Sequence, residues 1–126
     1  MKCVLDTHFL IWIVTGAPRL KQFPWLQRYA SWGVSPVSFL EVQLLAESGR
    51  LKLRPAAFTE AIKADPRFMV DDIATSVLFQ KALELGWTRD PFDRLLAAHS
   101  LARRTPLCTT DSDILKHHSL IVSELR

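Results

Sequence analysis

The residues Cys3-Val4-Leu5-Asp6-Thr7-His8 place an acid directly after a short apolar run. Three apolar residues in a row are typical of a strand that is buried on both faces, as in a parallel sheet. The following residues, 8–14, are mostly apolar and predict a helix with one inner face. Asp6 is therefore expected at the junction between a buried strand and a helix.

Strands and helices alternate along the rest of the chain. Further strands are expected at 33–35, 68–70, 106–109 and 120–122, and helices at 19–30, 36–49, 55–64, 73–85 and 90–104, with a helical turn at 113–116. Pro24 should interrupt the segment 19–30, and Gly49 should follow the end of the helix before it. This alternation predicts an α/β fold with a parallel or mostly parallel sheet.

The composition fits a single domain over residues 1–126. With 48% hydrophobic residues the chain can bury a core, and no apolar run approaches the ~20 residues that span a bilayer. Asp6 also interrupts the apolar stretch that a signal peptide would continue, so we expect a cytoplasmic protein with no membrane partner. The net charge of +3 is too small to indicate nucleic-acid binding by itself. Cys3 and Cys108 lie in apolar runs and are predicted to be buried thiols.

Four acidic residues occupy equivalent places, just after a predicted strand or at the start of a predicted helix. They are Asp6, Glu41, Asp93 and Asp111. Because the ends of parallel strands and the starts of the following helices meet along one edge of a sheet, we expect these carboxyl groups to converge. Carboxylates brought together repel one another, and a divalent cation relieves the repulsion. The pattern therefore predicts a site for Mg²⁺ or Mn²⁺, which suits phosphodiester chemistry.

Each of these acids also has an ordinary structural interpretation. Asp6 can serve as a turn residue or a helix N-cap. Ser38-x-x-Glu41 has the form of a capping box with Glu41 at the third helical position, so a capping role and a ligand role are supported about equally. Asp90 precedes a proline, which is typical of an N-cap, and Asp93 follows three residues later. We assign capping mainly to Asp90 and metal binding to Asp93.

Asp111 lies among hydroxyl and carboxyl side chains that suit a hydrated Mg²⁺ and equally suit an ordinary turn. Asp113 is the weaker candidate because it begins the next helical turn. Asp71 and Asp72 are predicted to cap the helix at 73–85. The histidines show no zinc-binding spacing; we expect His117-His118 at the surface and His99 packed within a helix or half-exposed.

Several motifs follow one another along the chain. They are Asp6-Thr7-His8-Phe9-Leu10-Ile11-Trp12, Ser38-x-x-Glu41, Glu47-x-Gly49-Arg50-Leu51-x-Leu53, Asp90-Pro91-Phe92-Asp93-Arg94-Leu95-Leu96-Ala97-Ala98 and Thr110-Asp111. In this order and at this chain length, the motifs resemble those of PIN-domain proteins, and more narrowly those of the VapC toxins of bacterial and archaeal toxin–antitoxin pairs. The resemblance spans residues 3 to about 122.

The resemblance implies a PIN-like three-layer α/β/α fold and a Mg²⁺- or Mn²⁺-dependent endoribonuclease. It also implies an RNA substrate, commonly transfer or ribosomal RNA, cleaved to leave a 5′-phosphate and a 3′-hydroxyl. A VapB-type antitoxin and a second copy of the chain in a homodimer are the implied partners.

On these motifs the acids of the family's site fall on Asp6, Glu41, Asp93 and Asp111. A threonine precedes Asp111 where relatives often have another residue, so Asp111 and Asp113 can exchange roles in this assignment. Residues expected to orient the ligands are Thr7, Ser38, Asp90, Thr110 and Asp113. Arg89 and Arg94, beside the acids, are candidate phosphate contacts or ordinary surface and ion-pair residues.

Two other classes of function fit part of the pattern. A catalytically inactive PIN-fold module that acts through a partner protein is the main alternative, although the presence of all four acids argues against it. Phosphotransfer domains also place an aspartate after their first strand. The haloacid-dehalogenase pattern requires a second aspartate two residues later, where this chain has His8, and a receiver domain requires an acid pair near that strand, which is missing.

Overall fold

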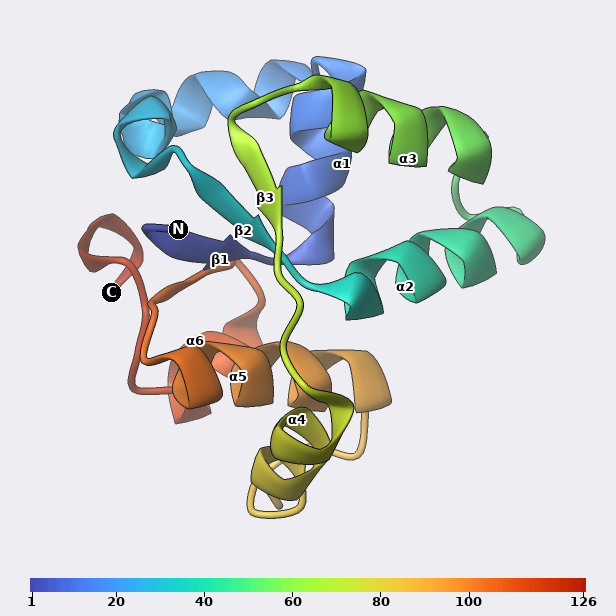
Figure 1. Ribbon diagram of the computed structural model, residues 1–126. Coiled ribbons are helices and arrows are strands. Elements are labelled where there is room, and N and C mark those ends of the chain that lie inside the picture. Colours follow the sequence, from blue (N-terminus) through green and yellow to red (C-terminus); the bar gives the residue numbers. More distant parts are fainter.

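Four short strands form one parallel sheet in the computed structural model, which describes residues 1–126 (Figure 1). The strands are β1 (Cys3–Leu5), β2 (Trp32–Val34), β3 (Phe68–Val70) and β4 (Leu107–Cys108). Their order across the sheet is β3-β2-β1-β4, and each neighbouring pair is parallel. The carboxyl ends of all four strands therefore lie along the same edge, as the alternation of strands and helices predicts.

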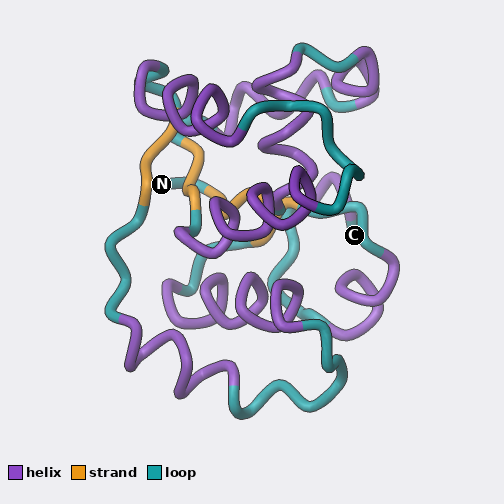
Figure 2. Tube along the Cα trace, turned by 90° about the vertical axis from the view of Figure 1, so that its right-hand side faces the viewer, coloured by secondary structure: helices purple, strands orange, loops and turns teal.

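Helices cover both faces of this sheet. The helices are α1 (Thr7–Thr15), α2 (Pro36–Glu47), α3 (Pro55–Ala64), α4 (Thr75–Ala82), α5 (Pro91–Arg103) and α6 (Ser112–His117), with 3₁₀ helices η1 (Pro18–Gln22), η2 (Pro24–Tyr29) and η3 (Ser123–Leu125). In Figure 1, α1 and α3 lie above the sheet, α4, α5 and α6 lie below it, and α2 extends from its carboxyl edge. Figure 2 shows the strands between an upper and a lower group of helices. The predicted three-layer α/β/α fold is confirmed.

The core lies between the sheet and these helices. Val4 and Leu5 of β1 are fully buried, as are Phe9 of α1 and Leu96 of α5, and these two helices cover opposite faces of the sheet. Each such side chain contributes about 1.5–3 kcal/mol when it leaves water. Cys3 and Cys108 are buried free thiols, as predicted. None of the helices is both long and apolar enough to cross a membrane.

Side-chain caps determine where the helices begin at the carboxyl edge. The capping residues are Asp6 for α1, Ser35 for α2, Asp90 for α5 and Asp111 for α6. Each has an extended backbone, and its side-chain oxygen accepts a hydrogen bond from a backbone N–H in the first turn of the helix. Three acids and one serine are thereby held at defined positions along this edge.

The predicted capping box in α2 is wrong. Pro36 takes the first helical position, so Ser35 is the N-cap and Ser38 lies inside the helix. Glu41 is consequently the sixth residue of α2 rather than the third. Its side chain is too far along the helix to bond the N-cap amide. Gly49 follows the end of α2 with a φ of +76°, as expected.

Three other predicted elements differ from the structure. The segment 19–30 forms 3₁₀ helices instead of an α-helix, because prolines at 18 and 24 each start a short helical segment. The strand predicted at 120–122 is reduced to an isolated bridge between Ile121 and Leu107. Helix α4 begins only at Thr75 and has no side-chain cap, so the predicted capping by Asp71 and Asp72 is wrong.

Candidate active site

Asp6 is the most enclosed of the four predicted acids and is only 5% exposed. Its carboxylate accepts a 2.6 Å hydrogen bond from the Thr109 hydroxyl and a longer one, of 3.4 Å, from the His8 backbone N–H. The parallel register pairs Leu5 with Cys108, which brings the next residues, Asp6 and Thr109, side by side. Thr109 was not among the predicted site residues, although pairing the two apolar runs in parallel would have pointed to it.

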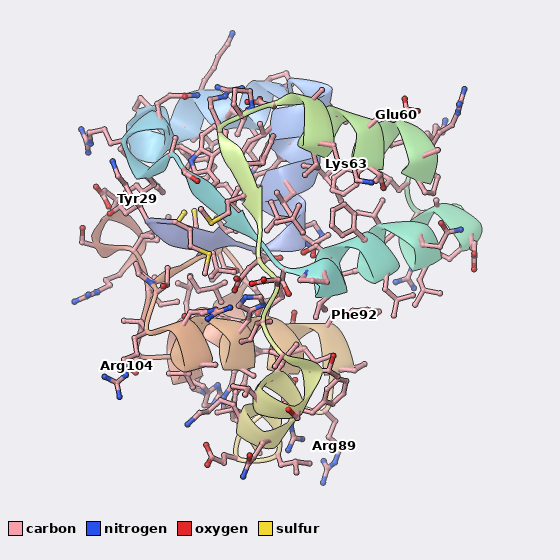
Figure 3. All side chains as sticks on the ribbon, viewed as in Figure 1. Tyr29, Glu60, Lys63, Arg89, Phe92 and Arg104 are labelled. Atoms are coloured by element: carbon pink, nitrogen blue, oxygen red, sulfur yellow. The ribbon has the colours of Figure 1, made fainter.

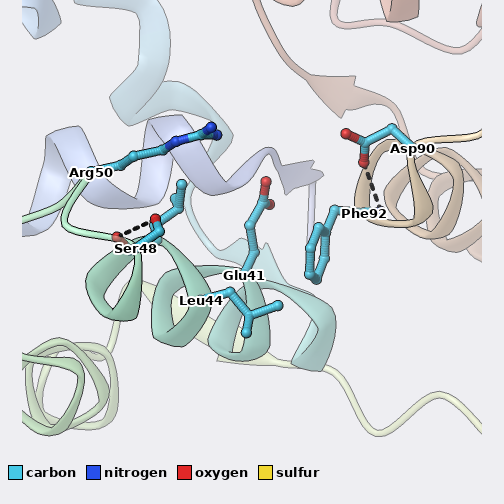
Figure 4. A pocket seen from close by; sticks show the side chains of 7 residues that line it. Glu41, Leu44, Ser48, Arg50, Asp90 and Phe92 are labelled. Carbon is cyan, nitrogen blue, oxygen red and sulfur yellow. Dashed lines mark hydrogen bonds between the residues drawn. The ribbon is translucent and has the colours of Figure 1, made fainter.

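Glu41 extends from α2 toward the start of α5 (Figure 4). Its Oε1 atom is buried and has no hydrogen-bond partner. Burial raises the pKa of Glu41, and the charges of Asp6 and Asp90 raise it further, whereas a hydrogen bond with Thr7 acts in the opposite direction. The Thr7 hydroxyl also lies 2.8 Å from the Ser38 hydroxyl. A buried carboxylate oxygen without a donor is costly, so this atom is suited to a ligand.

Asp93 lies in the first turn of α5, where its backbone N–H donates to Asp90. Burial, and after it the charges of Asp90, Asp111, Asp6 and Glu41, together raise the pKa of Asp93 to about 7. Asp93 is thus within electrostatic reach of all four of these acids. The structure therefore gathers side chains that are separated by up to about a hundred residues in the sequence.

Asp111 and Asp113 are distinguished by their positions. Asp111 is half-buried, caps α6 through a 3.0 Å hydrogen bond from the Ile114 N–H, and contributes to the raised pKa of Asp93. Asp113 is exposed in the first turn of α6. Thr110 is half-buried in the connection between β4 and α6. Asp111, and not Asp113, is among the charges that raise the pKa of Asp93.

His8 lies at the rim of this group, and the sequence did not single it out as a site residue. Its side chain is 59% exposed, and its Nδ1 atom is 3.7 Å from a carboxylate oxygen of Asp6. The interaction with Asp6 raises the pKa of His8, and the charges of Glu41 and Asp93 raise it further. No Lys or Arg side chain forms an ion pair with Asp6, Glu41, Asp93 or Asp111.

A second buried polar group connects α2, α5 and the end of β3. The Ser35 hydroxyl lies 2.9 Å from Nδ1 of His99, and Nε2 of His99 lies 2.7 Å from Asp71. Arg103 donates to both oxygens of Asp71, at 2.7 and 2.9 Å. Because the Asp71 carboxylate can only accept, the neutral His99 ring donates to it from Nε2, and Nδ1 then accepts from the Ser35 hydroxyl. We call these four side chains, Ser35, His99, Asp71 and Arg103, the Asp71 network.

Every member of the Asp71 network has a partner. Burial alone would raise the pKa of Asp71, but the hydrogen bonds from Arg103 and His99 lower it below its usual value. Burial lowers the pKa of His99, so its ring is neutral at pH 7. This network fixes the start of α2 against α5, the two helices that carry Glu41 and Asp93.

The other histidines divide between surface and interior. His117 is exposed, as predicted, and its ring stacks on Trp87 with centroids 5.2 Å apart. The expectation that His118 is at the surface is wrong, since it is 5% exposed and its Nε2 lies 3.0 Å from the Ser100 hydroxyl. Burial lowers the pKa of His118. Neither residue is part of the acidic group, by which we mean Asp6, Glu41, Asp93 and Asp111.

The arginines near the acids have different roles. The Arg94 guanidinium donates to the backbone carbonyls of Ala82, Leu83 and Thr88, so it closes the connection between α4 and α5 and is not free to contact a ligand. Arg89 is exposed at the α4 end of the molecule (Figure 3). Arg50, which was not predicted to take part, lines a pocket beside Glu41 (Figure 4).

The acidic side chains suit a hard divalent cation. Their donor atoms are all carboxylate oxygens, and the unpartnered oxygen of Glu41 and the raised pKa of Asp93 are features that a cation would relieve. No three acidic, histidine or cysteine side chains come close enough, as they stand, to hold one ion together. Mg²⁺ keeps several of its waters and needs only one or two direct carboxylate ligands. The arrangement thus fits a hydrated Mg²⁺ or Mn²⁺.

Comparison with known proteins identifies the family. The crystal structure of VapBC2 from Rickettsia felis, bound to a DNA fragment from their promoter, contains a chain with the same fold, at a TM-score of 0.63 and 17% identity over 96% of each chain. Comparison with curated proteins gives no significant match. Residues 3–119 match the family model for the PIN domain. The chain therefore belongs to the PIN domain family.

Proposed function

We propose that this protein is a VapC-type toxin, a ribonuclease that hydrolyses RNA phosphodiesters with Mg²⁺ or Mn²⁺ at Asp6, Glu41, Asp93 and Asp111. The observation that carries the proposal is the raised pKa of Asp93, which burial and four neighbouring acids bring to about 7. Carboxylates held together without a cationic side chain reduce stability, and such shifts are typical of functional sites. The membership in the PIN domain family supports this interpretation.

The proposed ligands differ in how they are held. Asp6 and Asp93 bind the cation directly, Glu41 binds it or positions the attacking water, and Asp111 acts through water. Thr109 keeps the Asp6 carboxylate in one orientation through its 2.6 Å hydrogen bond. Residues with a supporting role are Thr7, Ser38, Asp90, Thr110 and Asp113.

When bound, a divalent cation lowers the pKa of water and neutralises charge that builds on the phosphate. Glu41, with a raised pKa and an unpartnered oxygen, is suited to accept the proton of the attacking water. The water oxygen attacks phosphorus, and the bond from phosphorus to the 3′ oxygen breaks. That oxygen takes a proton from solvent, which leaves a 3′-hydroxyl and a 5′-phosphate.

The proposal includes two protein partners. The resemblance to VapC proteins and the fold shared with a chain of a VapBC2 structure support a VapB-type antitoxin. The resemblance alone supports a homodimer, and transfer or ribosomal RNA as the substrate.

The alternative is a PIN-fold module that binds a partner without catalysis. The observation in its favour is that no three potential ligands converge on one point. Cleavage of RNA by the purified protein separates the two functions, because a binding module would leave RNA intact whatever metal is added.

The test is incubation of total cellular RNA with the protein in Mg²⁺, Mn²⁺ or EDTA, beside the variants Asp93→Asn and Asp72→Asn. Asp72 is fully exposed and outside the acidic group, so its variant is the matched control. We expect discrete fragments that require metal, persist with Asp72→Asn and fall by about 10²–10³-fold with Asp93→Asn. Equal cleavage by wild type and Asp93→Asn, or no cleavage at all, would reject the nuclease.

A further inference from the structure

The pocket beside Glu41 has features that the proposed catalytic roles leave unused. It has a volume of about 370 Å³ and lies between α2 and the start of α5 (Figure 4). Its lining residues are Glu41, Leu44, Leu45, Ser48, Arg50, Asp90 and Phe92. Figure 4 shows Arg50 on one side of Glu41, and Phe92 and Asp90 on the other. The pocket therefore joins a cationic end to an apolar wall beside the acids.

Arg50 is an unpaired cation on a fixed backbone. Its backbone N–H donates to the Leu45 carbonyl at 2.9 Å, and Gly49, with a φ of +76°, turns the chain after α2. The guanidinium makes no hydrogen bond, ion pair or contact with an aromatic ring. A positive charge at this position also has a structural explanation, because Arg50 follows the end of α2 and helix C-termini are partly negative. That effect does not use the donors of the guanidinium, which remain available to an anion.

The wall of the pocket is formed by apolar side chains that stay accessible. Leu44 is 44% exposed, and Phe92 is half-exposed in the first turn of α5. Phe92 packs against no other aromatic ring, unlike Phe9, Phe23 and Phe39. An accessible ring and an unpaired guanidinium on two sides of one pocket match the two parts of a nucleotide, because a base stacks on the ring and a phosphate pairs with the cation.

We infer that this pocket holds the nucleotide next to the cleaved phosphodiester of a single-stranded RNA, with its base against Phe92 and Leu44 and its phosphate on Arg50. The inference rests on the proposed ribonuclease function and adds a residue-level site for the substrate. Only an unpaired nucleotide presents its base face in this way, so single-stranded segments are the expected targets. With the cleaved phosphate beside Glu41, the neighbouring nucleotide lies at this pocket, which favours RNA over a protein segment as its occupant.

The test measures binding of a fluorescein-labelled single-stranded RNA octamer of mixed sequence to the Asp93→Asn protein in Mg²⁺, at several salt concentrations. In that background, Arg50→Ala should weaken binding about tenfold and reduce the slope of log affinity against log salt by about 0.7. Arg50→Lys should keep the slope, because the charge remains. Arg54→Ala removes an equal charge from an exposed arginine outside the pocket, and should change neither quantity.

The ring is tested separately. Phe92→Leu keeps an apolar wall but removes the stacking surface, so binding should weaken by about tenfold with no change in the salt slope. The melting temperature of each variant is compared with that of its parent, and Phe92→Tyr, which keeps the ring, should restore binding. Recovery with Tyr but not with Leu supports stacking instead of a general loss of packing.

Several outcomes overturn the inference. If Arg50→Ala and Arg54→Ala weaken RNA binding equally, the contribution of Arg50 is non-specific charge attraction. If the protein cleaves RNA but the substitutions at Arg50 and Phe92 leave RNA binding unchanged, the substrate binds elsewhere. If Arg50→Ala leaves RNA binding intact and weakens binding of a partner protein, the pocket is a protein-docking site. If the wild-type protein neither binds nor cleaves RNA, the proposed ribonuclease function fails together with the inference. In each of the other outcomes the inference fails while the ribonuclease function stands.

Discussion

Two aspartates lie against the same helix, α5, and their carboxyl groups are shifted in opposite directions. Asp93, in the first turn of α5, has its pKa raised to about 7 by burial and by four neighbouring acids. Asp71, which contacts His99 and Arg103 farther along α5, has its pKa lowered: burial opposes the shift, and the hydrogen bonds of Arg103 and His99 outweigh it. Burial acts in the same direction on both, so the partners decide the result.

This difference distinguishes the Asp71 network, which holds α2 against α5, from the acidic group of the candidate active site. In the Asp71 network each donor meets an acceptor, and removing one member leaves the others unsatisfied. In the acidic group, removing one carboxylate relieves repulsion among the rest. The same kind of substitution should therefore destabilise one region and stabilise the other.

The largest effect on stability is expected from breaking the Asp71 network. Asp71→Ala removes the acceptor of His99 and of Arg103, and should lower the free energy of unfolding by about 3 kcal/mol, since one of these donors is fully buried. Urea unfolding measures the loss. Asp72→Ala, at the exposed neighbouring position, should change stability by less than about 0.5 kcal/mol, and similar losses for both variants would refute a special role of Asp71.

Metal binding should act on the acidic group alone. At about a hundred times its dissociation constant, Mg²⁺ or Mn²⁺ should stabilise the folded protein by about 2.7 kcal/mol, measured as a rise in melting temperature. Asp93→Asn and Asp111→Asn should remove the rise, and asparagine at 111 still caps α6. Asp113→Asn should keep it. If the metal-induced rise in melting temperature is lost with Asp113→Asn and kept with Asp111→Asn, Asp113 and not Asp111 is the fourth acid of the metal site.

His99 tests whether the Asp71 network depends on hydrogen bonds or on volume. His99→Leu fills a similar space but leaves Ser35 without an acceptor, and should cost about 2 kcal/mol in unfolding free energy. His99→Gln can donate to Asp71 and accept from Ser35, so its loss should stay below about 1 kcal/mol. If calorimetry finds the same loss for both variants, packing accounts for the contribution of His99 to stability and the hydrogen bonds do not.

The smallest effect should have the opposite sign. Without metal, Asp93→Asn should stabilise the protein by about 1 kcal/mol, or about 4 °C in Tm. The pKa of Asp93 is higher in the folded protein than in the unfolded chain, so its contribution to stability falls as pH rises from about 4 to 7. The advantage of the variant should accordingly grow between pH 5 and pH 8. A constant or shrinking advantage, in melting curves recorded in EDTA, would contradict the raised pKa.

The outcome for individual residues shows how far local patterns reach. The apolar run before Asp6 and the Asp90-Pro91 pair predicted a buried strand and a helix start, and both are confirmed. Glu41 was placed three residues into its helix, because Ser38 offers the same capping chemistry as Ser35. Pro36, which takes the first helical position as Pro91 does in α5, is the local signal that separates them. Asp71 was assigned to a cap, since its actual partners, His99 and Arg103, are 28 and 32 residues away.

The sequence by itself determined the alternation of strands and helices, the parallel sheet and the edge at which Asp6, Asp93 and Asp111 lie, because these follow from apolar periodicity and capping within a few residues. Only the tertiary structure decided which aspartate is paired and which is not. It also decided that Arg94 closes a loop while Arg50 remains unpaired in the pocket. The reason is physical: the charge state of a buried group depends on neighbours within a few ångströms, and folding draws those neighbours from distant parts of the chain.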